Sequence, residues 1–376
     1  MNVTFWSDSV VPSIAANSIQ VMKMCDAFTK LGHTTTLHAK KSHKFSSYNR
    51  AHLKDLYGIT TKFNIIYHSS HRSIRHLDYD LKVLTRLLTT KTDIVYTRSL
   101  RGALLANIFG KKTILELHFL PITTSSTRIL KKISASNSLH KIIVISNRLK
   151  QLLLSKHPYL SANRIETFHD AVDIERFSGS SFDPTAKKLG LNLNPSRKII
   201  MYVGHLYPGR GINLIEQLAE KLPGIDFIVI GGTENEVLYR KTRSEEMGLC
   251  NLVYYGFIPN AKLHNYYQIA DILIMPYQKQ VSVSSGGNTV DWMSPMKTFE
   301  YMASGKPLIS SDLPALREVL NEDVAVLVEP DNVEQWKSSI ENTLTNCSFA
   351  NKIAQNARQR AEENTWESRA HNILSC

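Results

Sequence analysis

The chain has 376 residues, of which 43% are hydrophobic and 21% charged, and its formal net charge is +12. That length is more than one hydrophobic core usually organises, and the composition excludes a disordered chain. No apolar run approaches the ~18 residues of a membrane-spanning helix, and the first residues lack the pattern of a secretion signal, so we expect a cytoplasmic protein. The four cysteines are scattered and form no CxxC pair, which favours reduced thiols over disulfides or a zinc site.

The first half of the chain alternates short β-branched runs with helical patterns. The expected strands are 2–6, 34–39, 63–67, 93–97, 113–118 and 142–146. Between the first two strands, apolar residues recur at three-residue steps over 17–31, which predicts an amphipathic helix. Strand–helix alternation of this kind predicts a parallel sheet with helices on both faces.

The same pattern restarts after the Ser-, Gly- and Pro-rich stretch 176–197, which is the best linker candidate. The expected strands of the second half are 199–203, 227–230, 252–257, 272–276, 307–310 and 324–328. We therefore predict an α/β protein of two doubly wound, Rossmann-like domains, 1–178 and 179–361, facing each other across a cleft. The last helix, about 362–376, is expected to pack back on the first domain. Ligands of open α/β sheets sit at the carboxyl ends of the strands.

The most informative motif is WMSPMKTFEYMASG, which begins at residue 292. Ser294 followed by Pro295 is typical of a helix start, where free amides and the helix dipole suit a pyrophosphate. Lys297 and Glu300 share one face of that helix. A carboxylate there can accept hydrogen bonds from both hydroxyls of a ribose. A capped surface helix with a Lys–Glu pair explains the same residues.

Two other strand ends and one loop contain candidate residues. In YVGHLYPGRG, an apolar strand runs into a turn that contains Arg210, whose guanidinium suits phosphate oxygens, although a plain turn fits equally well. In LELHFLP, His118 ends a strand, and it or Glu116 can hydrogen-bond a sugar or an acceptor. Lone histidines are more often structural. A loop with the pair Gly286-Gly287 allows close approach of backbone to a ligand.

Together these stretches resemble retaining glycosyltransferase family 4, whose members have the GT-B fold. The resemblance extends over nearly the whole chain and is strongest from GHLYPGRG through NLVYYGFIP and ADILIMPY to SPMKTFEYMASGKPLISSDLPALREVL. In the first domain it rests on SIAANSIQVMKMCDAFTKLGH, DIVYTRS and FHDAVDIERF. Several weak motifs in the right order are much more specific than any one of them.

The resemblance implies a role for each matching residue. Arg210 takes the place of the family's phosphate-binding lysine, Glu300 matches the glutamate that holds the donor ribose, and His118 matches a histidine that approaches the transferred sugar. Asn17 and Ser18 lie where the first-domain loop meets the donor. The predicted site therefore consists of catalytic His118, Arg210 and Glu300 and of donor-binding Asn17, Ser18, His205, Arg210, Ser294, Lys297 and Glu300.

Three positions depart from the family's pattern. His205 stands where the family has a phosphate-binding arginine, Trp292 replaces the first glutamate of a paired motif, and Asp170-Ala171 replaces an Asn-Gly pair. Trp292 leaves open which group stabilises the sugar as it ionises; Asp291 and backbone amides near Gly286 are the candidates. The chain matches better to a sub-branch of the family that reads SP-x-K-x-x-E-Y. We therefore do not interpret Trp292 as a loss of activity.

The resemblance implies glycosyl transfer with retention, and the donor diphosphate leaves towards Arg210, Lys297 and the helix start at Ser294. We expect neither a metal nor another cofactor, because these groups offset the growing charge. The sequence Asp78-Tyr79-Asp80 has the letters of a DxD metal motif, but it opens an amphipathic helix rather than following a strand. A sugar-nucleotide epimerase of similar architecture and a non-catalytic nucleotide-sugar-binding module remain alternatives.

Positive charge is concentrated in the first half of the chain. Residues 1–178 contain 26 Lys and Arg against 11 Asp and Glu, whereas residues 179–376 contain 19 against 22. This asymmetry favours contact with phosphate groups, as on an anionic membrane surface or a lipid-linked acceptor, and so predicts peripheral membrane attachment. A solubilising surface is the simpler explanation. We do not expect nucleic acid as a partner, since no nucleic-acid-binding motif is recognisable.

Overall fold

The computed structural model describes residues 1–42, 49–178, 190–191, 193–282 and 288–375. The chain forms two compact units, Met1–Asp170 with Trp366–Cys376, and Ala171–Thr365. This division differs from the sequence-based boundaries after 178 and 361. It falls earlier in the first case because Val172 already pairs with Thr365, and Phe177 packs against the core of the second unit.

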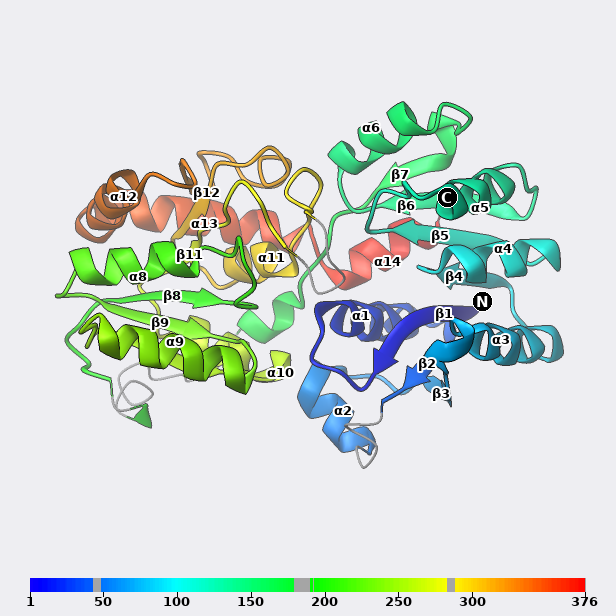
Figure 1. Cartoon of the computed structure of the whole chain (residues 1–376), viewed down its shortest axis with the longest axis horizontal. Helices are drawn as coiled ribbons and strands as arrows, with labels where there is room; N and C mark the ends of the chain where they lie inside the picture. Colours follow the sequence, from blue (N-terminus) through cyan, green and yellow to red (C-terminus); the bar gives the residue numbers. More distant parts are fainter. Residues whose placement is uncertain (43–48, 179–189, 192, 283–287, 376) are drawn as a thin grey trace. The chain divides into compact units, whose positions relative to one another are not determined.

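The first unit is built on a seven-stranded parallel sheet in the order β3-β2-β1-β4-β5-β6-β7 (Figure 1). Its strands are β1 (Asn2–Val11), β2 (Thr34–Lys41), β3 (Asn64–His68), β4 (Ile94–Thr97), β5 (Thr113–Leu117), β6 (Leu139–Val144) and β7 (Ile165–Thr167). Its helices are α1 (Ala16–Lys30), α2 (Arg50–Tyr57), α3 (Leu77–Thr89), α4 (Leu100–Ile108), α5 (Thr124–Ser134), α6 (Asn147–Lys156) and α14 (Trp366–Leu374).

The second unit repeats the plan with six parallel strands in the order β10-β9-β8-β11-β12-β13. Its strands are β8 (Ile199–Val203), β9 (Asp226–Ile230), β10 (Leu252–Gly256), β11 (Ile272–Met275), β12 (Leu308–Ser311) and β13 (Val326–Val328). Its helices are α8 (Ile212–Lys221), α9 (Glu234–Glu246), α10 (Asn260–Tyr267), α11 (Met296–Ala303), α12 (Val333–Thr345) and α13 (Cys347–Glu362).

Both sheets confirm the predicted doubly wound architecture. In each unit the chain builds outward from its first strand and then returns to that strand's other side, which places topological switch points between β1 and β4 and between β8 and β11. Ligands bind beyond the carboxyl ends of the strands at such points. The expected strands are present with small shifts, and β7, a three-residue strand at the sheet edge, is the one that the sequence did not predict.

Helix α1 shows how the sequence pattern becomes packing. Met22, Cys25 and Phe28 are fully buried, as their three-residue spacing predicts. The helix is not amphipathic as expected, however, because Lys23 and Asp26 on its other side are buried too. The C-terminal helix α14 belongs to the first unit and packs against α1, where Lys30 Nζ and Glu367 Oε1 lie 2.5 Å apart. Among the residues that the structure describes, every helix is too short or too polar to cross a bilayer.

Candidate functional site

The turn after β8 is pressed against the segment that follows β11, at the switch point of the second sheet. Gly209 and Gly211 adopt left-handed backbone conformations, with φ of +83° and +80°. A Cβ atom at Gly209 would overlap the carbonyl oxygen of Gln280, and one at Gly211 would overlap that of Pro276. The turn therefore requires glycine at both positions, and this close approach fixes Arg210 between them.

Two cations share one aromatic ring beside this turn. Lys297 Nζ lies 4.0 Å from the ring centroid of Tyr202 and 5.0 Å from that of Tyr277, and the guanidinium of Arg210 lies 4.9 Å from the Tyr277 centroid. Lys297 Nζ and Arg210 Nε are buried and have no hydrogen-bond partner among the described residues. Burial lowers the pKa of Lys297 well below its usual value, and Arg210 adds to the effect. Glu300, one helical turn beyond Lys297, opposes both effects, and the two basic side chains lie against the same ring of Tyr277.

His205 does not replace the family's arginine as a cation. Its ring stacks on Tyr207 with centroids 4.8 Å apart and planes 4° from parallel. Burial, followed by the charges of Arg210 and Lys297, lowers the pKa of His205 to about 4. The imidazole is therefore neutral near pH 7, so it offers hydrogen bonding and stacking rather than charge.

Helix α11 begins one residue later than the sequence predicts, and the expected cap at Ser294 is wrong. The N-cap is Pro295, in an extended conformation with ψ of 127°, and it provides no side-chain hydrogen bond. Pro295 thus precedes the helix instead of opening it. No acidic residue stands in the first turn either, so the positive end of the helix dipole has no side-chain anion of its own.

Glu300 is a carboxylate whose orientation is fixed by two donors. Asn260 Nδ2 donates to its Oε1 and the hydroxyl of Tyr267 donates to its Oε2, each at 2.7 Å. Each carboxylate oxygen can accept a further hydrogen bond. Glu300 is half-buried, so it remains accessible to a ligand. On the same helix, the hydroxyl of Tyr301 accepts a hydrogen bond from the Val203 amide at 2.7 Å, which ties α11 to the end of β8.

The first unit places His118 directly after β5 and gives it a buried partner. His118 Nε2 hydrogen-bonds Oε1 of Glu116, and the side chain of His118 is 19% exposed. Glu116 is completely buried and also accepts from Gln20 Nε2 at 2.8 Å and from the guanidinium of Arg369. Of the two residues that the sequence offered as sugar ligands, Glu116 is enclosed by other side chains and only His118 is partly exposed.

Asn17 and Ser18 lie in the first turn of α1 and face different surroundings. Asn17 is exposed. Ser18 is buried, and its hydroxyl donates to the carbonyls of Ser13 and Ala15, both at 2.8 Å. Ser18 thus shapes the loop before α1, and its contact with a donor, like that of Asn17, stays a prediction.

The structure gathers His205, Arg210 and Lys297 at one switch point, with Glu300 one helical turn beyond Lys297. Sequence reasoning missed the aromatic partners of the cations, Tyr202 and Tyr277, because only the fold brings these tyrosines together. The Gly286-Gly287 pair lies outside the described residues.

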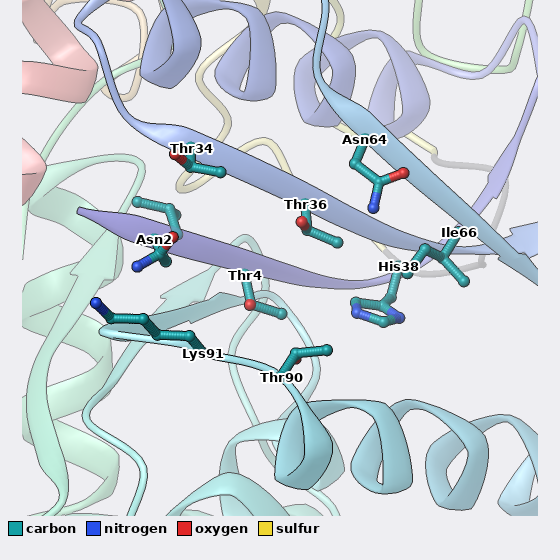
Figure 2. Close-up of a pocket in the computed structure, with 10 residues that line it drawn as sticks. Asn2, Thr4, Thr34, Thr36, His38, Asn64, Ile66, Thr90 and Lys91 are labelled. Atoms are coloured by element: carbon teal, nitrogen blue, oxygen red, sulfur yellow. The ribbon is translucent and has the colours of Figure 1, made fainter.

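Both aspartates of the DxD letters make ion pairs. Asp78 pairs with His71 and Lys82, and Asp80 pairs with Arg101 at 3.1 Å. The described part of the chain contains no group of three or more potential metal ligands. A pocket of about 130 Å³ lies over the amino-terminal halves of β1, β2 and β3 and is lined by Thr34, Thr36 and other polar side chains (Figure 2). None of the predicted site residues lines it.

Two family descriptions match the two halves of the chain. Residues 18–176 match Glycosyltransferase Family 4, and residues 185–360 match Glycosyl transferases group 1. Together the matches extend over most of the sequence. The chain therefore belongs to the family 4 glycosyltransferases, which confirms the resemblance and the transferase class.

Individual relatives are more distant. The D-inositol 3-phosphate glycosyltransferase of Mycobacteroides abscessus is 24% identical over 220 residues, which are 56% of this chain and 46% of that enzyme. This chain thus spans about half the length of the curated relatives it matches. Among solved structures, Anabaena Alr3699/HepE in complex with UDP is similar over 100% of this chain and 99% of its own, with a TM-score of 0.77 and 14% identity. WaaG, a glycosyltransferase involved in lipopolysaccharide biosynthesis, is similar over 99% of this chain and 100% of its own, with a TM-score of 0.69 and 13% identity. These likenesses establish the GT-B fold.

Proposed function

We propose that the protein is a retaining, metal-independent glycosyltransferase that moves a sugar from a nucleoside diphosphate sugar to a hydroxyl acceptor. It needs no cofactor, and its pathway is glycolipid or cell-surface polysaccharide biosynthesis. The acceptor oxygen bonds to the anomeric carbon on the face from which the diphosphate departs, without a protein nucleophile. In the first unit, His118 contacts the transferred sugar, and Asn17 and Ser18 contact the donor.

The pair of buried cations beside Tyr277 carries this proposal. Lys297 Nζ has no acceptor among the described residues, and Arg210 lies over the same ring. A diphosphate would accept hydrogen bonds from both side chains and offset their charge. Its charge grows as the glycosidic bond breaks, so fixed cations stabilise the transition state more than the bound donor. Two protein cations and a helix N-terminus then do what Mg²⁺ does in metal-dependent transferases.

Glu300 supports a nucleotide as the donor's leaving part. Asn260 and Tyr267 hold its carboxylate, which is half-buried beside α10, and the remaining acceptor capacity of both oxygens suits the paired hydroxyls of a ribose. The HepE structures contain UDP and UDP-glucose. We therefore propose that the donor is a uridine diphosphate sugar.

The exposed face of α3 supports an anionic membrane or a lipid-linked acceptor. Leu77, Leu81 and Leu88 are exposed at helical spacing, and Lys82 and Arg86 are exposed on the same helix. Apolar side chains that enter the interface and cations that meet anionic headgroups are what an interfacial helix needs. The side chain of Arg72 and residue Lys44, which belong to the same basic half, lie outside the described residues.

A donor panel tests the transferase. Wild-type protein is incubated with uridine-, guanosine-, adenosine- and thymidine-diphosphate sugars in excess EDTA, and released nucleoside diphosphate is measured. We expect release with at least one donor at the same rate with and without EDTA. When an acceptor alcohol is added, the glycoside that forms should have the anomeric configuration of the donor. Strict dependence on Mg²⁺ or Mn²⁺, restored when the metal is added back, would overturn the metal-independent mechanism.

Vesicle sedimentation tests the membrane contact separately. We expect binding to vesicles with anionic lipid at low salt, and loss of binding at about 0.5 M salt, where screening is strong. Leu81→Asp is expected to weaken binding. Leu238→Asp on α9 is the matched control, because Leu238 and Leu81 are 66% and 61% exposed. Protein that stays in the supernatant at low salt contradicts the membrane contact and leaves the donor site untouched.

A further inference from the structure

We propose that Glu116 and Arg369 are positioning residues for His118. They hold its imidazole with the proton on Nε2, so that Nδ1 is the unprotonated nitrogen of the ring. The role of His118 in sugar transfer rests on the function proposed above. Its orientation rests on side chains that surround it in the first unit, one of which comes from the C-terminal helix.

The first step is that Glu116 can only accept. It is fully buried at the end of β5, where Gln20 Nε2 donates to it at 2.8 Å and two Arg369 nitrogens lie at 3.1 and 3.2 Å from its oxygens. Burial alone raises the pKa of this carboxyl, but Arg369 and His118 outweigh burial and hold the pKa below its usual range. An ionised carboxylate has no proton to give, so His118 Nε2 must be the donor.

The second step is that His118 stays neutral. Burial lowers its pKa to about 4, with Arg98 contributing in the same direction, and this outweighs the opposing effect of Glu116. A neutral imidazole has one proton. With that proton on Nε2, Nδ1 is an acceptor, which suits a hydrogen bond from a sugar or acceptor hydroxyl.

The third step is that Arg369 is immobilised where it stands. Its side chain is 3% exposed, its Nε donates to the carbonyl of His169 at 2.7 Å, and its Nη2 donates to that of Phe168 at 3.3 Å. Arg369 lies on α14, which follows the whole second unit in sequence and returns to the first. The C-terminal helix therefore completes the support of a residue that lies some 250 positions earlier in the chain.

A purely structural Arg–Glu pair would stabilise the fold without setting the tautomer of His118. Histidine ¹⁵N chemical shifts separate these roles, because they distinguish Nδ1–H, Nε2–H and doubly protonated rings. The protein has 14 histidines, so the His118 signals are assigned by their loss in His118→Asn. The spectra are recorded on the full chain between pH 6 and 8, without substrate, and so do not depend on the enzymatic assay.

The expected results are specific for each variant. Wild type shows the Nε2–H tautomer throughout that range. Glu116→Gln, which keeps the shape and removes the charge, gives a mixture of tautomers, and turnover falls by up to about a hundredfold with less than a twofold change in donor KM. Glu367→Gln is the matched control. Glu367 lies on α14, as Arg369 does, and its ion pair is with Lys30 of α1, so the substitution leaves the Glu116 network intact.

Loss of Arg369 alone leaves a buried carboxylate uncompensated, and the variant risks misfolding. Glu116→Gln combined with Arg369→Met removes both charges, so the effect of the pair on the His118 tautomer can be measured without an uncompensated buried charge. An Nδ1–H tautomer in wild type, or an Nε2–H tautomer and turnover unchanged by Glu116→Gln, overturns the proposal. If wild type transfers no sugar from any donor, the proposed function fails, and the spectra still decide whether Glu116 and Arg369 position His118.

Discussion

In the first unit, the buried guanidinium of Arg369 meets the carboxylate of Glu116 at 3.1 and 3.2 Å. In the second unit, Lys297 Nζ is also buried, but its neighbours are the rings of Tyr202 and Tyr277, and no described residue accepts a hydrogen bond from it. Burying a charge is costly unless a partner compensates it. The first arrangement pairs opposite charges within the chain, whereas the second places two basic side chains against one aromatic ring. This difference is why we propose the second cluster, and not the first, as the site of an anionic ligand.

Asp170 is a buried carboxyl group that interacts with Arg369 and Glu116, and its substitution has the largest expected effect. Burial raises its pKa from 3.8 to about 7, and Arg369 opposes that rise only in part. The folded protein then binds a proton that the unfolded chain releases above pH 4. Stability therefore falls as pH rises from about 4 to about 7, by at most about 4 kcal/mol.

Asp170→Asn removes this titration and is expected to stabilise the protein at pH 8 while changing little at pH 4. Urea unfolding at both values measures the difference. Asp93→Asn is a control, because Asp93 is an exposed carboxylate of the same unit whose pKa is shifted down rather than up. Equal pH dependence of stability in wild type and Asp170→Asn would show that Asp170 is not the source.

Arg210 tests the cluster of the second unit, in which Arg210 and Lys297 lie against Tyr277. Since charge on the diphosphate grows as the bond breaks, Arg210→Ala is expected to lower kcat by about a hundred- to a thousandfold and to affect donor affinity much less. Steady-state kinetics at saturating donor measure this. Arg317→Ala, at an exposed arginine of the same unit, is expected to leave kcat unchanged. Wild-type turnover in Arg210→Ala would make Arg210 a turn residue only.

Glu300 tests the neutral part of the donor. Glu300→Gln should weaken binding of a nucleoside diphosphate and of the corresponding sugar donor alike, because both contain the ribose. The loss of charge-assisted hydrogen bonds corresponds to roughly 1.5–3 kcal/mol, or one to two decades in Kd. Calorimetry with both ligands measures the change. Unchanged affinity for the nucleoside diphosphate would rule out the ribose assignment.

The sequence predicts the doubly wound sheets well, because continuous apolar runs such as 199–203 alternate with helical patterns along the chain. It is less reliable where tertiary packing decides. Ser294 and Pro295 have the letters of a helix start, yet Pro295 is extended and the helix begins after it. Strand β7 was missed because only one of its three residues is apolar, whereas the equally short β13 is apolar throughout.

The site was predictable in its charged residues and not in their surroundings. Arg210, Lys297 and Glu300 are visible in sequence because each belongs to a motif at a strand or helix end. Their partners come from other elements: Asn260 from α10 and Tyr277 from the segment after β11. Arg369 was beyond prediction, since nothing local to WESRAHNIL points to a carboxylate some 250 residues away.

Lys297 gives the smallest expected effect and the most direct test of diphosphate binding beside Tyr277. Its pKa is held well below the usual value by burial and by Arg210. A bound diphosphate would raise that pKa again, so binding should take up a fraction of a proton at a pH between the two values, and affinity should weaken by less than one decade per pH unit as pH rises.

Calorimetry at pH 8 and above, in buffers of different ionisation enthalpy, measures the uptake; at that pH the ligand's own phosphate is already ionised. Lys297→Arg is the matched control, because a guanidinium stays charged throughout. His205, whose pKa is about 4, lies too low to contribute in this range. Tyr202 and Tyr277 stay neutral, since burial raises the pKa of both hydroxyls. We therefore expect uptake in wild type and none in Lys297→Arg. The same uptake in both proteins would assign the proton to another group, and no uptake in either would mean that Lys297 is already charged and balanced before the ligand arrives.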